Sequence, residues 1–212
     1  MSHKARGFTL VELLVAISIL AIVAVLGWRG LDGIVRARVA LTDQMETTRG
    51  MQLAFAQMQS DSEHMVSASE VQQRPTLQAD AGGMTLVRNS YTENGPSQLQ
   101  VISYRIRDGV LLRRESIGTR DLIQLDMLWK SATSNADTTP PVALQSGVQA
   151  MQVEVWENNG WRVAAAQPPP PQGGQPPPGQ QWKPLPATGL RVSLVVQNQA
   201  VPMSKAFLLG GM

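Results

Sequence analysis

The chain opens with a long run of apolar residues that one charge interrupts. Phe8–Leu26 holds 19 residues, and Glu12 is the charged one among them. As a helix, at about 1.5 Å per residue, this run extends about 28 Å, close to the hydrocarbon thickness of a bilayer. Apolar residues then recur at helical spacings as far as Met65, and the first proline is Pro75. We therefore predict one long helix over residues 8–65, half in membrane and half in water.

Beyond Ser67 the pattern changes to that of short strands. The segments predicted as strands are Met84–Arg88, Gln98–Arg107, Val110–Glu115, Val148–Trp156, Trp161–Val163, Leu190–Val196 and Val201–Leu208. Asp108-Gly109 fits a two-residue hairpin turn, and Asn158–Gly160 and Gln197–Gln199 mark two more hairpins. Pro202 indicates that the last strand lies at a sheet edge. The predicted fold class is α+β, with a long N-terminal helix packed on an antiparallel sheet.

The length of 212 residues suits one ordinary domain with one long appended element. We divide the chain into a basic stub at residues 1–7, a transmembrane half-helix at 8–28, an aqueous half-helix at 29–66 and a β-rich head at 67–212. Residues 167–186 are mostly Pro, Gly and Gln. This composition predicts a mobile or polyproline loop within the sheet and not a separate domain.

Composition excludes several classes of function. Of the 18 basic side chains two, Lys4 and Arg6, lie in the first seven residues, and the remaining 16 balance the 16 acidic ones. Basic residues elsewhere are sparse, which argues against a nucleic-acid partner. The chain has no cysteine, which excludes disulfides, cysteine–zinc sites and thiol nucleophiles. It has two histidines, His3 and His64, which leaves little material for a histidine-based metal site. We expect neither a metal nor a cofactor.

Two groups of polar residues could be interpreted as a catalytic site and as a calcium site, and we reject both interpretations. Asp61, Ser62 and His64 stand too close in sequence to build a catalytic triad, which is assembled from separated segments. We interpret them as the solvated end of the helix and predict no catalytic residue. Glu93–Gly95 and Glu157–Asn159 offer oxygen ligands of the kind that calcium accepts, but turns use the same residues for backbone reasons.

Glu12 is the strongest functional candidate. A carboxylate within an apolar span costs about 2.5–3.5 kcal/mol on insertion scales and is a functional candidate by default. The run offers no other charge as a partner. Cleavage after Gly7 would give Phe8 a free α-amine, and Glu12 would then attract the amine of a neighbouring subunit. The basic stub keeps the N-terminus cytoplasmic.

The segment Gly7-Phe8-Thr9-Leu10-Val11-Glu12 resembles the type III signal of type IV pilins and pseudopilins. The resemblance implies a pilin-like fold and a single-pass position in the bacterial inner membrane with the head in the periplasm. It also implies cleavage between Gly7 and Phe8 by a prepilin peptidase, N-methylation of Phe8 and a role for Glu12 in filament assembly.

Further segments resemble the J-type minor pseudopilin of type II secretion systems. They are Leu31-Asp32-Gly33, Met51–Phe55 with Asp61, Val101–Arg114, Ser146–Met151 followed by Trp156 and Gly160-Trp161, and Phe207–Leu209. This resemblance implies a subunit of the pseudopilus tip complex, with I-type and K-type minor pseudopilins and other pseudopilins as partners. The complex initiates pseudopilus assembly and promotes export of folded proteins. From the apolar stripe of the helix we expect a partner interface at Ile34, Leu41, Met45 and Phe55.

Three alternatives remain beside this interpretation. The first is a minor pilin of a type IV pilus, which the lack of cysteine disfavours because major pilins usually carry a disulfide loop. The second is a membrane-tethered periplasmic hydrolase, for which no nucleophile–base pair is evident. The third is an ordinary signal peptide, but Ala21–Ala24 has the wrong spacing for its cleavage site and Glu12 interrupts the apolar core.

Overall fold

The computed structural model describes residues 9–80, 82–91, 95–134, 136, 138–157, 159–164, 187–197, 199 and 201–210, and the statements below concern these residues. The chain divides into two units, Met1–Thr48 and Arg49–Met212. Helix α1, Leu10–Glu63, contributes residues to both units. The predicted long helix is thereby confirmed. The predicted Pro-rich loop at 167–186 lies outside the described residues.

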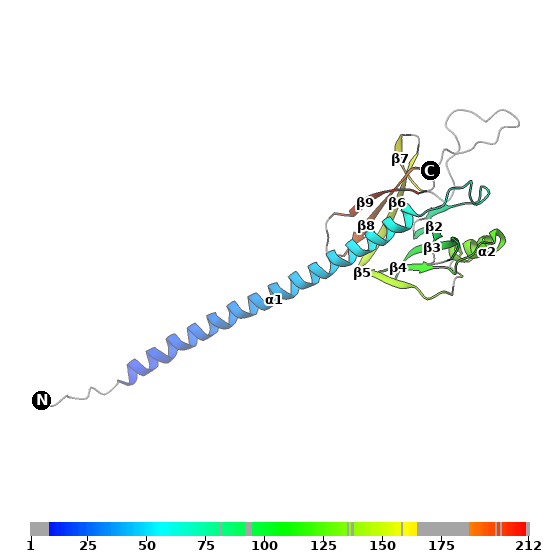
Figure 1. Cartoon of the computed structure of the whole chain (residues 1–212). Helices are drawn as coiled ribbons and strands as arrows, with labels where there is room; N and C mark the ends of the chain where they lie inside the picture. Colours follow the sequence, from blue (N-terminus) through cyan, green and yellow to red (C-terminus); the bar gives the residue numbers. More distant parts are fainter. Residues whose placement is uncertain are drawn as a thin grey trace. The chain divides into compact units, whose positions relative to one another are not determined.

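The second unit combines the last turns of α1 with the head, which contains two antiparallel sheets (Figure 1). The first sheet has the order β1-β2-β3-β4-β5, with β1 Leu77–Asp80, β2 Gly83–Ser90, β3 Gln98–Arg107, β4 Val110–Glu115 and β5 Val142–Ser146. The second sheet has the order β7-β6-β8-β9, with β6 Val148–Glu157, β7 Gly160–Val163, β8 Gly189–Val196 and β9 Met203–Leu208. The predicted α+β class is confirmed, with two sheets in place of one.

Glycine and aspartate turns set the strand register. Asp108 and Gly109 both have positive φ, 51° and 73°, as a tight hairpin requires, and Arg107 pairs with Val110 across the turn. The bounds of β3 and β4 therefore match the prediction residue for residue. Gly147, with φ of 73°, is the single residue between β5 and β6 and takes the chain from the first sheet to the second.

Three elements were missed in the sequence. Helix α2, Leu122–Thr133, begins where the Asp121 side chain accepts a hydrogen bond from Ile123 N, at 2.8 Å. Strands β1 and β5 are short: β1 alternates apolar and polar side chains over four residues only, and β5 does not alternate. The last strand starts at Met203, so Pro202 precedes the strand and the predicted start at Val201 was wrong.

The core lies between the last turns of α1 and the inner faces of both sheets. The residues of α1 that enter it are Met51, Ala54, Phe55 and Met58. The Phe55 ring lies 6.3 Å from the Phe207 ring of β9, and Gly210 N donates a hydrogen bond to Ser62 O at 2.8 Å. A second cluster, including Val87, Val101 and Leu125, fills the space where α2 covers the outer face of the first sheet.

Candidate functional site: the amino-terminal helix and its buried anchor

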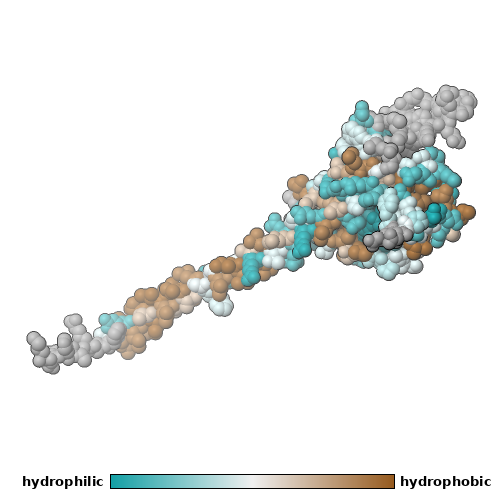
Figure 2. Space-filling model, viewed as in Figure 1, coloured by the Kyte–Doolittle hydropathy of each residue, from teal (hydrophilic) through white to brown (hydrophobic). Residues whose placement is uncertain are grey.

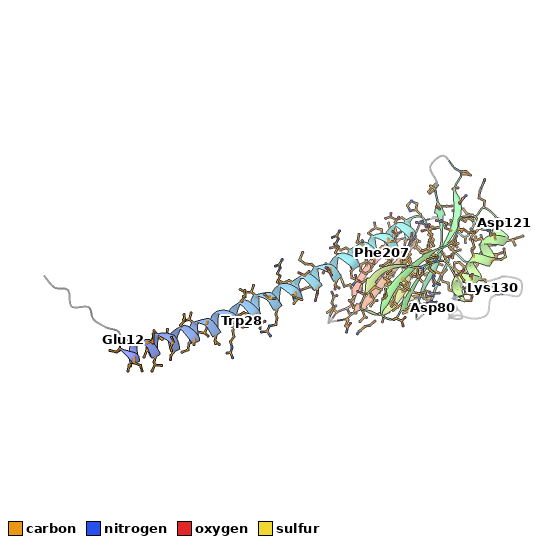
Figure 3. All side chains as sticks on the ribbon, turned by 90° about the horizontal axis from the view of Figure 1, so that it is seen from below. Glu12, Trp28, Asp80, Asp121, Lys130 and Phe207 are labelled. Atoms are coloured by element: carbon orange, nitrogen blue, oxygen red, sulfur yellow. The ribbon has the colours of Figure 1, made fainter. Side chains whose placement is uncertain are left out.

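Glu12 closes a hydrogen-bonded ring at the start of α1. Its Oε2 accepts from Thr9 N at 3.1 Å and from Thr9 Oγ1 at 2.9 Å, while Glu12 N donates to Thr9 Oγ1 at 3.3 Å. This is a capping box, in which a Thr and a Glu three residues later satisfy each other's backbone N–H groups. Figure 3 labels Glu12 at the first turn. Sequence reasoning missed this role, although the Thr-x-x-Glu spacing is its signature.

The apolar run after Glu12 is exposed along its whole length. The large apolar side chains from Leu10 to Leu26 are each at least half exposed. Figure 2 shows them as a continuous brown surface on this part of α1. The helix is long and apolar enough to cross a membrane, and Ser18 Oγ is satisfied within it by Leu14 O at 2.8 Å. These features are those of a membrane anchor.

The four residues expected at a partner interface fall into two environments. Ile34, Leu41 and Met45 lie on one side of α1 and are exposed, Met45 to 72%. Asp32 and Arg36 form an ion pair on the same stretch of helix. Phe55 is only 6% exposed and packs in the core of the head. We therefore no longer expect Phe55 to contact a partner, because this chain already covers it.

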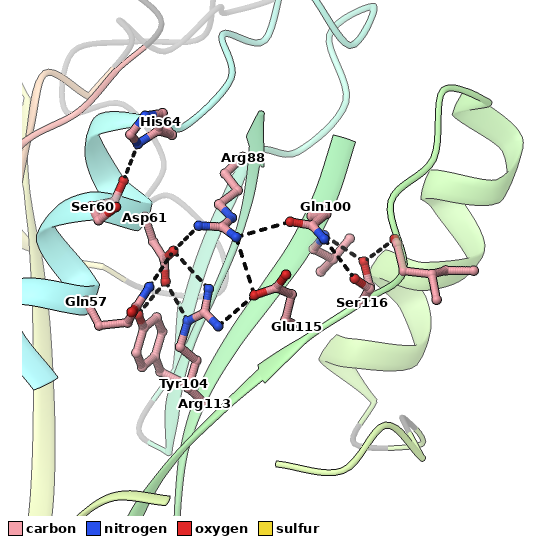
Figure 4. Close-up of polar contacts among 12 residues, drawn as sticks. Gln57, Ser60, Asp61, His64, Arg88, Gln100, Tyr104, Arg113, Glu115 and Ser116 are labelled. Atoms are coloured by element: carbon pink, nitrogen blue, oxygen red, sulfur yellow. Dashed lines mark hydrogen bonds and ion pairs between the residues drawn. The ribbon is translucent and has the colours of Figure 1, made fainter. Parts of the chain in front are cut away.

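Asp61 is not part of a solvated helix end, as the sequence suggested, but is fully buried (0% exposed). Its carboxylate accepts from Arg113 Nε at 2.8 Å and Nη2 at 3.0 Å, and from Arg88 Nη1 at 2.8 Å. Tyr104 OH donates to its Oδ2 at 2.5 Å. Figure 4 shows these groups converging on the last turns of α1, and we call them the Asp61 anchor.

The Asp61 anchor continues outward through charged and polar partners. Glu115 Oε2 lies 2.8 Å from Arg113 Nη1 and 3.3 Å from Arg88 Nη2. Two carboxylates thus face two guanidinium groups. Gln100 Oε1 accepts from Arg88 Nη2 at 3.1 Å, and its Nε2 donates to Ser116 O at 3.3 Å (Figure 4). The buried charges are paired, which is the condition under which a folded protein tolerates them.

Burial and ion pairing shift the pKa values of two groups of the Asp61 anchor, Tyr104 and Arg113. Burial, followed by the negative charge of Asp61, raises the pKa of the Tyr104 hydroxyl far above its ordinary value. Burial alone would lower the pKa of the Arg113 guanidinium, but its hydrogen bonds and attraction to Asp61 raise it overall. Tyr104 therefore stays protonated and donates, and Arg113 stays charged, over the whole physiological range.

The anchor fixes the end of α1 to three strands at once. Arg88 comes from β2, Tyr104 from β3 and Arg113 from β4, and Asp61 accepts from all of them. Its burial had a signal in the sequence, because Asp61 and Ser62 continue the helical spacing of Met51, Ala54, Phe55 and Met58. Because acidic residues are mostly exposed in folded proteins, Asp61 was interpreted as solvated in spite of this spacing.

Ser62 and His64 at the end of α1 bond to backbone carbonyls of their own helix. Ser62 Oγ donates to Met58 O at 2.7 Å, and exposed His64 places Nδ1 2.8 Å from Ser60 O. In the part of the chain that the structure describes, no three His, Cys, Asp or Glu residues group as metal ligands. Gly7, Phe8, Glu93 and Asn158 lie outside the described residues.

Two family models match this chain over adjoining ranges of residues. The model of a family described as prokaryotic N-terminal methylation motif matches residues 2–28, and that of the type II secretion system (T2SS), protein J, matches residues 29–202. This chain belongs to the type II secretion system protein J family. The second match takes in both the exposed stripe and the Asp61 anchor. The predicted resemblance is confirmed.

Two curated relatives carry the same family name. Type II secretion system protein J of Escherichia coli is 33% identical over 128 residues, which cover 53% of this chain and 64% of the relative. Type II secretion system protein J of Klebsiella pneumoniae is 29% identical over 124 residues, covering 53% of this chain and 63% of the relative. The chain thus spans somewhat under two thirds of the length of these protein J relatives.

Proposed function

We propose that this protein is a minor pseudopilin of a type II secretion system. It serves in the pseudopilus tip complex, which initiates pseudopilus assembly and promotes export of folded proteins across the outer membrane. The observation that supports this most directly is the pair of adjoining family matches, one over the apolar start of the chain and one over residues 29–202. We propose a structural role and not an enzymatic one.

The proposed position is a single pass through the bacterial inner membrane. The exposed apolar run of α1 supplies the anchor. The N-terminus lies in the cytoplasm, where Lys4 and Arg6 precede the span, and the head lies in the periplasm. A prepilin peptidase cleaves between Gly7 and Phe8, and Phe8 is then methylated. The methylation-motif match over residues 2–28 supports this processing.

The proposed partners are other pseudopilins, in particular the I-type and K-type minor pseudopilins. The exposed side chains of Ile34, Leu41 and Met45 supply an apolar surface for the helix of a partner. Glu12 adds an electrostatic contact to the Phe8 amine of a neighbouring subunit, which is strong where water is scarce. The Asp61 anchor keeps the last turns of α1 in place on strands β2, β3 and β4.

The capping box allows the charge of Glu12 to be tested separately from its role in starting the helix. Glutamine also serves as the third residue of a capping box, so Glu12→Gln keeps the helix start and removes the charge. We expect the variant to be processed and inserted, to crosslink poorly to other pseudopilins and to support secretion weakly in a strain lacking the gene. The matched control is Thr9→Val, which removes the cap hydroxyl and keeps the carboxylate, and we expect nearly normal crosslinking.

Normal crosslinking and secretion by Glu12→Gln would refute the proposed role of its charge. The wider proposal has a separate test in the same strain. Loss of the gene should abolish or strongly reduce secretion, and the full chain should co-purify with I-type and K-type minor pseudopilins. Loss of pili with intact secretion would instead support the type IV pilus alternative.

A further inference from the structure

Two adjacent residues of α1, Trp28 and Arg29, lie where the uncharged part of the helix ends. The residues from Leu13 to Trp28 carry no charge, and Arg29 is the first charged residue after Glu12. The Trp28 side chain is 74% exposed, and Arg29 is exposed beside it (Figure 3). An indole ring and a guanidinium group thus stand next to each other on the surface of α1, and we call them the boundary pair.

The guanidinium of Arg29 makes no ion pair or hydrogen bond with the residues that the structure describes. Asp32, one turn away, is the nearest acidic residue that follows it, and its carboxylate pairs with Arg36 instead. A guanidinium presents five N–H donors in a planar fork that matches the oxygen atoms of a phosphate. The donors of Arg29 are therefore available to a ligand outside the described part of the chain.

The length of the apolar run places the boundary pair at the surface of a bilayer. Residues 8–28 number 21, and as a helix they extend about 32 Å, against about 30 Å of hydrocarbon. The headgroup layer beyond the hydrocarbon is about 5–8 Å thick on each side. Because the stem of an arginine is long and flexible, a guanidinium at position 29 reaches the depth of the lipid phosphates.

The two side chains of the boundary pair suit the two sides of the headgroup layer. Indole rings are enriched at membrane–water interfaces, because the ring is apolar and its N–H group finds a partner among the headgroups. Arginine binds phosphate through charge-assisted hydrogen bonds that are often bidentate. Trp28 therefore fits the boundary with the hydrocarbon, and Arg29 fits the phosphate groups one residue further along α1.

We propose that the boundary pair binds phospholipid headgroups at the periplasmic surface of the membrane and sets the depth of α1. This inference rests on the proposed single-pass position and deepens it. The occupant is lipid, because the pair follows directly on the apolar run and pairs an interfacial ring with an unpartnered guanidinium. At about 1.5 Å per residue, Ile34 then lies about 8 Å and Met45 about 24 Å beyond Arg29 along α1. Subunits held at one depth meet with such side chains at matching heights.

Cysteine labelling measures the depth of α1, since the chain has no cysteine of its own. A side chain added at Gly27, Gly30 or Gly33 would meet no neighbouring part of the chain within 4 Å, so a cysteine fits at each. The full chain with one such cysteine is placed in phosphatidylcholine nanodiscs, and its rate of reaction with a water-soluble maleimide is measured. We expect slow reaction at Gly27→Cys, fast reaction at Gly33→Cys and an intermediate rate at Gly30→Cys.

Replacing Arg29 by leucine removes the phosphate ligand and lets the apolar run continue to Leu31. We expect α1 to sink and the reaction at Gly30→Cys to slow at least about fivefold, since hydrocarbon accepts leucine and strongly disfavours arginine. Arg29→Lys keeps a charge that binds phosphate and should restore most of the wild-type rate. Arg38→Leu is the matched control and should change no rate, because exposed Arg38 lies nine residues further, about 14 Å along the helix.

Quenching of Trp28 fluorescence by brominated lipid identifies the ligand. The chain has five tryptophans, so the emission of Trp28 is taken as the difference between the wild type and Trp28→Phe. Bromine near the headgroup should quench it more than bromine near the end of the acyl chain. Equal quenching, or an unchanged rate at Gly30→Cys in Arg29→Leu, would overturn the proposal and leave the boundary pair for a partner subunit. Rapid labelling of Ala21→Cys would instead overturn the proposed membrane position itself.

Discussion

The carboxylate of Asp61 holds two guanidinium groups and a phenol inside the head. Removing it in Asp61→Ala leaves Arg88 and Arg113 buried with Glu115 as their remaining acidic partner. Breaking a buried pair in this way costs about 3–5 kcal/mol. We expect the free energy of unfolding of the full chain in detergent, measured by urea titration, to fall by about that amount.

The matched control for this change is Asp126→Ala. Asp126 pairs with Arg74 at 2.8 Å, but its side chain is 53% exposed. Surface pairs of this kind contribute about 0–1 kcal/mol. Equal losses in the two variants would show that the Asp61 anchor does not stabilise the head.

Single residues are also where sequence reasoning failed. Phe55 and Asp61 carry opposite chemistry, yet both belong to the same buried side of α1. An aromatic residue on the apolar stripe of a helix can contact a partner protein or pack in the core of its own chain. An acidic residue near the end of a helix is usually exposed to solvent. Their burial depends on Phe207, Arg88 and Arg113, which come from distant strands. No local pattern could supply those partners.

At the scale of elements, α1 offers a test of the exposed stripe. Met45→Glu places a charge on the side shared with Ile34 and Leu41, where we propose that a partner helix packs. Val39→Glu is the control, because Val39 is 55% exposed on a different side of the helix. We expect Met45→Glu to weaken co-purification with the I-type partner at least about tenfold, since burying an unpaired charge is strongly unfavourable. Val39→Glu should bind nearly as the wild type does.

Equal binding by the two variants would place the interface elsewhere. Either variant should retain the thermal unfolding midpoint of the wild type, because both side chains are exposed in the isolated chain. A lower midpoint for Met45→Glu alone would show that a folding defect, and not a lost contact, explains weak binding.

Among the elements, local signals predicted those with strong periodicity or turn chemistry. The long apolar helix and the β3–β4 hairpin around Asp108-Gly109 followed from their residues. Strand β5 did not follow from its own residues, because its extended conformation depends on pairing with β4. Helix α2 packs on β3, and its Asp121 cap and helical spacing were readable in the sequence, but no element was predicted there.

For the whole molecule, processing is the decisive prediction. We expect the wild-type protein extracted from membranes to lack residues 1–7 and to begin at Phe8 with one methyl group. Intact mass measurement checks both. The basic stub meets the apolar run at this junction, and glycine presents no side chain to a protease. A strain without prepilin peptidase is the control and should yield the uncleaved chain.

Retention of residues 1–7 in the wild type, or cleavage near Ala24, would contradict the pseudopilin assignment. Cleavage near Ala24 would also remove the capping box and most of the apolar run together. The product would then be a protein released from the membrane, as the signal-peptide alternative requires.

The contact between the end of α1 and the last strand has a consequence for biogenesis. Phe55 packs on Phe207, and Ser62 O accepts from Gly210 N, so residues about 150 positions apart close the same core. The apolar side of the last turns of α1 therefore stays uncovered until the ribosome has made β9. In the proposed orientation, we expect the head to fold only after its translocation is nearly finished.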